Sequence, residues 1–163
     1  MIHEVEGDIL LTHADVIAHG VAPDDHFDQG LALALRSRWP SMAKDFRHWC
    51  RIQHPKPGSI WAWPRPDGKR IVNLLTQDPA PTNTSHPRPA KLKYVNKSLK
   101  ALGKWAKKEG VETLALPKLA TGVGGLEWDD VEALIRKHLA KAEVEVFVYS
   151  VYHPGEEADE HLD

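Results

Sequence analysis

Three short segments of the sequence combine glycine with polar residues in a pattern that suits the binding of an anion. Residues 7–10 read Gly-Asp-Ile-Leu, residues 19–30 run from a histidine to a glycine, and residues 120–125 read Ala-Thr-Gly-Val-Gly-Gly. Glycine lets the backbone approach a ligand closely, and consecutive amides near a helix N-terminus form a cradle for phosphate. A tight strand-to-helix turn explains residues 122–125 about as well as a phosphate site does. This segment alone therefore does not establish that a phosphate binds there.

The elements that must position these segments follow from the pattern of apolar residues. Runs of β-forming residues predict strands over residues 2–5, 15–19, 59–63, 70–75, 111–117 and 144–151. Asp67-Gly68 is a hairpin-type turn signal between two of these strands. Helices are expected over residues 30–37, from Pro40 onward, over residues 92–105 and from Asp129 onward.

Strands and helices therefore alternate along most of the chain, which predicts an α/β fold with a mixed sheet covered by helices. In such a sheet, ligands bind beyond the carboxyl ends of the strands, where loops lead into helices. All three glycine-bearing segments follow a predicted strand. The tail, residues 154–163, is acidic and lacks apolar periodicity, so we expect it to be frayed, with the folded unit covering residues 1–153.

Composition excludes several classes of protein. The 163 residues are 42% hydrophobic and 27% charged, typical of one soluble domain, and no apolar run reaches the about 20 residues of a membrane span. Cys50 is the only cysteine and no signal-peptide pattern opens the chain, so a cytoplasmic monomer without disulfides is expected. The net charge of −2 gives no general attraction to nucleic acid, and the lysines over residues 91–108 favour a solvated helix face.

The ten histidines raise the question of a metal site. They show no i, i+4 pair and no His-x-His spacing, and a lone cysteine offers no thiolate cluster. We therefore expect no metal and no cofactor.

Taken together, the motifs resemble the macrodomain family over about residues 2–152. Residues 5–10 resemble its opening strand followed by Gly-Asp-Ile, residues 19–32 have the spacing of its first ligand loop, and residues 116–128 (Leu-Pro-Lys-Leu-Ala-Thr-Gly-Val-Gly-Gly-Leu-Glu-Trp) resemble its second. The resemblance is closest to the branch that holds the terminal ADP-ribose–glutamate hydrolase, the bacterial DNA ADP-ribosyl glycohydrolases and the yeast ADP-ribose-1″-phosphate phosphatase. It implies a three-layer α/β/α fold with a central mixed six-stranded sheet.

The resemblance also implies a site for ADP-ribose. Asp8 and Ile9 are expected at the adenine, with Tyr149 or Tyr152 stacking beside it, whereas Asp8 as a turn cap and Tyr149 as a core residue are the alternatives. The remaining implied contacts to the diphosphate and the distal ribose are Gly20, Val21, Gly30, Thr76, Gln77, Thr121, Gly122, Val123, Gly124 and Gly125.

Two departures from the family pattern concern catalysis. Gln77 stands where the hydrolases of this branch carry a lysine, and Gly124 stands where the terminal hydrolase carries an aspartate, so a lysine-based mechanism is not expected. The catalytic candidates are then His19, as an imidazole titrating near neutrality, with Asp24 and Asp28 as carboxylates that orient water. Structural alternatives are a backbone-satisfied histidine and solvated loop aspartates.

Two functions follow from these expectations. The first is a hydrolase that removes ADP-ribose from a modified protein or nucleic acid, or a terminal group from an ADP-ribose derivative. The second is a non-catalytic module that reads ADP-ribose. In either case the partner is ADP-ribose or an ADP-ribosylated macromolecule, with nucleic acid only as a modified substrate and no membrane.

Overall fold

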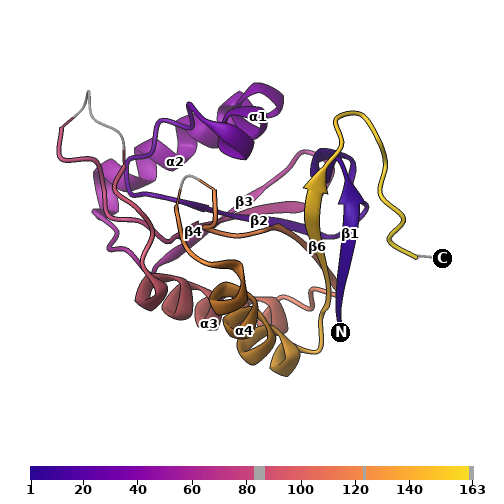
Figure 1. The fold of residues 1–163 in the computed structure, drawn as a ribbon. Coiled ribbons are helices and arrows are strands. Elements are labelled where there is room, and N and C mark those ends of the chain that lie inside the picture. Colours follow the sequence, from indigo (N-terminus) through magenta and orange to yellow (C-terminus); the bar gives the residue numbers. More distant parts are fainter. Residues whose placement is uncertain (83–86, 123, 162–163) are drawn as a thin grey trace.

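A six-stranded sheet forms the centre of the computed structural model (Figure 1), which describes residues 1–82, 87–122 and 124–161. Its strands, in the spatial order β1-β6-β5-β2-β4-β3, are β1 (Ile2–Gly7), β2 (Val16–Val21), β3 (Ile60–Pro64), β4 (Arg70–Leu75), β5 (Thr113–Pro117) and β6 (Glu145–Tyr152). All neighbours pair in parallel except β3, which joins β4 as an antiparallel hairpin. The predicted mixed six-stranded sheet is confirmed.

Helices cover both faces of this sheet (Figure 1). On one side lie α1 (Gly30–Arg38) and α2 (Pro40–Gln53), and on the other lie α3 (Leu92–Lys108) and α4 (Trp128–Leu139). Short 3-10 turns, η1 (Ile9–Leu11) and η2 (Ala140–Ala142), follow β1 and α4. No helix of the described residues is long and apolar enough to span a bilayer.

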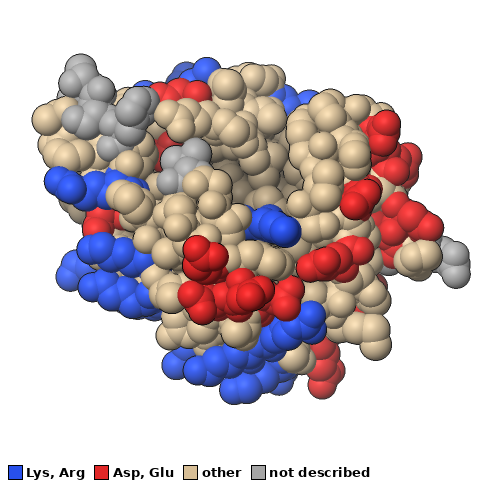
Figure 2. All heavy atoms as spheres, viewed as in Figure 1, with Lys and Arg blue, Asp and Glu red and all other residues tan. Residues whose placement is uncertain are grey.

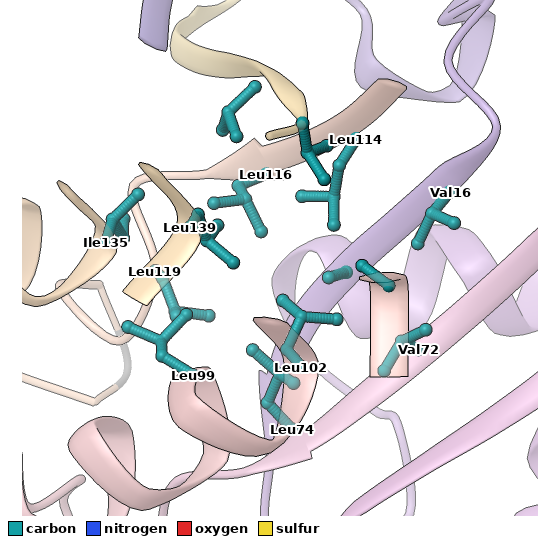
Figure 3. Close-up of a cluster of buried hydrophobic side chains, with 14 of the residues drawn as sticks. Val16, Val72, Leu74, Leu99, Leu102, Leu114, Leu116, Leu119, Ile135 and Leu139 are labelled. Atoms are coloured by element: carbon teal, nitrogen blue, oxygen red, sulfur yellow. The ribbon is translucent and has the colours of Figure 1, made fainter. Parts of the chain in front are cut away.

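The alternation of side chains along the strands builds a core on each face. Leu114 and Leu116 of β5 pack with α3 and α4, whereas Ala115 between them faces the opposite side with Phe147. Figure 3 shows Leu99 and Leu102 of α3 meeting Leu139 of α4 and the strand residues in this layer.

α3 and α4 pack very closely at one point. A Cβ on Gly103 would lie 2.8 Å from the carbonyl oxygen of His138, so only glycine fits in that turn of α3. This close packing fixes how α4 lies on the sheet, and with it the loop that precedes α4.

The parallel pairing gathers the carboxyl ends of five strands at one edge. Gly7 of β1 is opposite Tyr152 of β6, and Tyr149 of β6 is opposite Pro117 of β5. β2 runs two residues further than predicted, so Gly20 and Val21 belong to the strand rather than to the loop. This edge is where the sequence places its three glycine-bearing segments.

The C-terminal tail does not fray over residues 154–161. The amide of Asp8 donates to the carbonyl of Glu156 (2.7 Å), and Glu160 is buried with its carboxylate bonded to Thr12 and Tyr149. The prediction of a frayed tail is therefore wrong for these residues, because side-chain hydrogen bonds that leave no periodic signal in the sequence hold the segment down.

Candidate functional site

Two adjoining cavities lie at the carboxyl edge of the sheet and share Gly30, Leu31 and Pro117 in their walls. Figure 2 shows the molecule hollowed near the middle of this face. The first, which we call the polar cavity, has a volume of about 280 Å³, and the second, the apolar cavity, has a volume of about 340 Å³. Because the walls are shared, the two form one elongated cleft.

The polar cavity brings together residues from four separate segments of the chain. They come from the end of β2, the loop before α1, the loop after β4 and the loop after β5. The lining includes His19, Gly20, Asp25, Asp28, Gln29, Gly30, Gln77, Lys118, Ala120, Gly122 and Gly124.

His19 lies at the base of the polar cavity and is only 2% exposed. Its Nε2 donates to Oδ1 of Asn73 (2.6 Å), and its ring contacts Phe27. Burial lowers the pKa of His19 to about 4, and the hydrogen bond to Asn73 opposes this only in part. The expectation of an imidazole titrating near neutrality is therefore wrong, and His19 is neutral at pH 7.

The acidic residues of the first loop divide into two that face the polar cavity and one that does not. Asp25 and Asp28 line it, whereas Asp24 is exposed, lies outside its walls and has left-handed backbone (φ 57°). The Asp25 carboxylate accepts from the amides of Ala22 (3.0 Å) and Phe27 (2.9 Å). Sequence reasoning chose Asp24 and missed Asp25, because adjacent aspartates in a turn carry the same signal until the backbone angles are known.

The two cavity-lining aspartates have different surroundings. Burial raises the pKa of Asp25, opposed by its two backbone amides and reinforced by the charge of Asp28. Asp28 is exposed at the cavity mouth. A carboxyl with a raised pKa beside an exposed carboxylate is an arrangement that can supply a general acid and a general base.

Gln77 reaches the polar cavity, and Thr76 does not. The side-chain amide of Gln77 donates to the carbonyl of Arg88 (2.9 Å), so it is held in place. Thr76 is fully buried behind Gly20, and its hydroxyl has no hydrogen-bond partner within the described part of the chain. Val21 is buried in the core beneath α1 and α2 and lines neither cavity.

The loop after β5 presents backbone to the polar cavity. A Cβ on Gly122 would meet nothing within 4 Å, whereas one on Gly124 would lie 2.5 Å from the carbonyl oxygen of Ala120. The loop therefore has no room for the carboxylate that the resemblance places at position 124. Thr121 bonds its hydroxyl to the carbonyl of Lys118 (2.7 Å) and lines neither cavity. Val123 lies outside the described residues.

Lys118 brings a positive charge to the polar cavity that sequence reasoning did not assign. It follows Pro117 at the end of β5, and its ammonium stands 5.7 Å from the centre of the Trp128 ring. Sequence reasoning considered a lysine only at position 77, where Gln77 stands, and left Lys118 unassigned. The sequence signal that could have identified Lys118 is its position in the Leu-Pro-Lys motif at the end of a predicted strand.

The apolar cavity is the second half of the cleft. It is lined by Gly7, Ile9, Leu10, Gly30, Leu31, Ala34, Pro117, Tyr149 and Tyr152. Tyr152 is 58% exposed, whereas Tyr149 is buried, and burial together with a hydrogen bond to Glu160 raises the pKa of its hydroxyl. A slot between apolar side chains and tyrosine rings fits a flat aromatic group.

Asp8 stands next to this apolar cavity without forming its wall. Its Oδ1 accepts from the amide of Leu10 (3.0 Å), which caps η1, and its Oδ2 accepts from the amide of Gly155 (3.0 Å). Asp8 is therefore a turn cap in this structure, and each oxygen keeps a lone pair for one further donor.

Within the described residues, no group of three or more histidine, cysteine or acidic side chains is close enough to hold a metal ion. Among the described residues, the polar cavity offers the carboxyl groups of Asp25 and Asp28, the Lys118 ammonium, the neutral His19 imidazole, the side-chain amides of Gln29 and Gln77, and backbone amides.

The chain is similar to known proteins over most of its length. Residues 66–135 match the Macro domain family. The chain is 28% identical over 157 residues to a DNA ADP-ribosyl transferase–DNA ADP-ribosyl glycohydrolase fusion protein of Thermosipho africanus, an alignment covering 89% of this chain but only 40% of that protein. It is 24% identical over 148 residues to the human ADP-ribose glycohydrolase OARD1, covering 90% of each chain.

Among solved structures, the macrodomain of Mycobacterium tuberculosis DarG superposes with a TM-score of 0.79 at 25% identity, covering 95% of this chain and 99% of that one.

Proposed function

We propose, from the premise that this chain belongs to the macrodomain family, that it is an ADP-ribosyl hydrolase that releases ADP-ribose from a modified macromolecule. The observation that carries the proposal is the continuous cleft, in which an apolar slot joins a cavity holding two carboxyl groups and an ammonium.

The two cavities match the two ends of ADP-ribose. The apolar cavity takes the adenine between Ile9 and Tyr149, and the open backbone at Gly122 faces the diphosphate. Lys118 adds charge where the phosphates cross from one cavity to the other. The distal ribose then lies in the polar cavity, beside Asp25 and Asp28.

The reaction in this arrangement is hydrolysis at C1″ of the distal ribose. Asp28, exposed at the mouth, accepts a proton from a water whose oxygen forms the new bond to C1″. The bond from C1″ to the macromolecule breaks, and Asp25, whose pKa is raised, gives its proton to the leaving atom. His19 is neutral and shapes the base of the cavity without exchanging a proton.

The class of macromolecule is a separate part of the proposal. The name of the Thermosipho africanus relative points to DNA as the carrier of ADP-ribose, whereas the name of the human relative specifies no carrier. This chain spans 40% of the length of the Thermosipho africanus relative. That the chain shares the activity of that whole protein is therefore a proposal. Removal of a 1″-phosphate is the second reaction that the same groups support.

A non-catalytic reader is the competing function, and two observations favour it. Gln77 is tied to the carbonyl of Arg88 and cannot form a Schiff base with an opened ribose, and Gly124 has no room for a carboxylate. A reader needs the cleft but not the proton transfers.

One experiment separates these functions. The protein is incubated with glutamate-, arginine-, serine- and thymidine-linked ADP-ribose and with ADP-ribose-1″-phosphate, and released product is measured by chromatography. The hydrolase proposal predicts release from at least one of them. Binding without release from any supports the reader instead, and absence of both overturns the assignment of the cleft.

A further inference from the structure

The segment from residue 154 to residue 161, which we call the C-terminal strap, lies across the beginning of η1 next to the apolar cavity. Figure 1 shows it leaving β6 and passing along the outer side of β1. Its backbone is tied to Asp8 twice, because the Asp8 amide donates to the carbonyl of Glu156 (2.7 Å) and the Gly155 amide donates to Oδ2 of Asp8 (3.0 Å).

Glu160 anchors the far end of this strap. Its carboxylate, in a residue only 5% exposed, accepts from the hydroxyls of Thr12 and Tyr149 at Oε2 (2.5 Å each) and from the amide of His13 at Oε1 (3.0 Å). A buried carboxylate is stable only when such donors surround it. Thr12 caps the C-terminal end of η1, and Tyr149 lines the apolar cavity. The Glu160 side chain therefore connects η1 with the strand β6 on the two sides of that cavity.

Gly7 shows how closely the strap follows β1. A Cβ at this position would lie 2.8 Å from the amide nitrogen of Ala158 and 2.9 Å from the carbonyl oxygen of Glu156, and the backbone there has φ 154°. The strap thus occupies the space that a side chain at Gly7 would need, and the path of the strap is fixed from both ends.

We propose that Glu160 is a positioning residue for the nucleotide base, holding Asp8 and Tyr149 in the geometry with which the apolar cavity takes an adenine ring. The inference rests on the proposed function, because it requires ADP-ribose in the cleft. Through the strap, Glu160 places the Gly155 amide on Oδ2 of Asp8, which fixes that carboxylate next to the apolar cavity with a lone pair left for a donor on the base. Through Tyr149, it fixes the ring that forms the wall.

Base discrimination tests this role directly. ADP-ribose and inosine diphosphate ribose differ only in the base, where hypoxanthine has an oxygen in place of the 6-amino donor. We expect the wild type to bind ADP-ribose about tenfold more tightly, the loss of one hydrogen bond to a charged group. Glu160→Ala should weaken binding of ADP-ribose about tenfold and bring the two affinities close together. Glu156→Ala, which removes an exposed carboxylate from the same strap, should match the wild type.

Turnover gives a second readout that simple destabilisation would not produce. Glu160→Ala should raise KM for an ADP-ribosylated substrate and leave kcat within about twofold, because the carboxyl groups of the polar cavity are untouched. Glu160→Gln keeps one oxygen for the two hydroxyls but turns its amide toward the His13 amide, so its base preference should be intermediate. This variant also serves if Glu160→Ala does not fold.

The outcomes separate this inference from the proposed function. Folded Glu160 variants that keep the full preference for ADP-ribose overturn the role of Glu160 while leaving the cleft assignment intact. A wild type that binds neither nucleotide overturns both.

Discussion

The Nε2 atom of His19 lies 2.6 Å from Oδ1 of Asn73, in a position that is almost completely closed to solvent. This pairing holds the ring in one orientation at the base of the polar cavity. Burial keeps it unprotonated, with a pKa of about 4 against an ordinary value of 6.5. His19, which the sequence suggests as a proton carrier, is thus a neutral side chain in the wall of the polar cavity.

A pH dependence of stability follows for His19. Between pH 6.5 and pH 4 the unfolded chain binds a proton at this position and the folded chain does not, so stability falls as the pH falls through that window. Between pH 7 and pH 5, the free energy of unfolding of the wild type should fall by about 2 kcal/mol more than that of His19→Gln. Urea unfolding at both pH values measures this. An equal change in both proteins would show that His19 titrates normally.

The aspartates of the first loop offer a comparison in which one position is the control. Asp25→Asn and Asp28→Asn should each lower turnover by about 10²- to 10⁴-fold, the usual worth of a positioned acid or base, with ADP-ribose affinity largely kept. Asp24→Asn should retain activity, because Asp24 lies outside the cavity walls. A loss confined to Asp24→Asn would return the catalytic role to that residue.

Two glycines of the second loop should respond in opposite ways. Gly124→Ala should destabilise the fold by about 1–3 kcal/mol, because its Cβ would overlap the carbonyl of Ala120. Gly122→Glu should fold normally and lose ADP-ribose binding, because its side chain would fill the space for phosphate. Thermal melts and a nucleotide titration distinguish the two. Retained affinity in folded Gly122→Glu would place the diphosphate elsewhere.

Lys118 is expected to bind phosphate and not to form a covalent bond. Lys118→Met should weaken ADP-ribose about 10- to 100-fold, the worth of a hydrogen bond to a charged group. Lys137→Met, on the distant end of α4, is the matched control. Borohydride added during turnover should trap no adduct on the wild type. A reducible adduct on Lys118 would instead assign it the role of nucleophile.

Much of this architecture is readable from the sequence, for physical reasons. The apolar periodicity of α3, the turn at Asp67-Gly68 and the carboxylates opening α4 are local signals, and each predicted element is present. The glycine-bearing segments were placed correctly because parallel pairing brings the carboxyl ends of strands to a single edge.

What the sequence did not reveal depends on contacts between distant segments. Glu160 bonds to Thr12, 148 residues away, and nothing in an acidic tail distinguishes one buried carboxylate from its exposed neighbours. Asp24 and Asp25 are adjacent residues of the same type, and only the folded loop leaves Asp24 exposed while Asp25 lines the polar cavity. The low pKa of His19 comes from its burial, which depends on residues far from it in the sequence. The expectations of a monomer and of a cytoplasmic location stay predictions.

The most direct test of the central claim is a calorimetric titration of the wild-type protein with ADP-ribose and, separately, with AMP. If the apolar and polar cavities together hold one ADP-ribose, that ligand should bind with a stoichiometry of one, and AMP, which lacks the second phosphate and the distal ribose, should bind at least about tenfold more weakly. No heat with ADP-ribose at millimolar concentration, or equal affinity for AMP, would contradict the account.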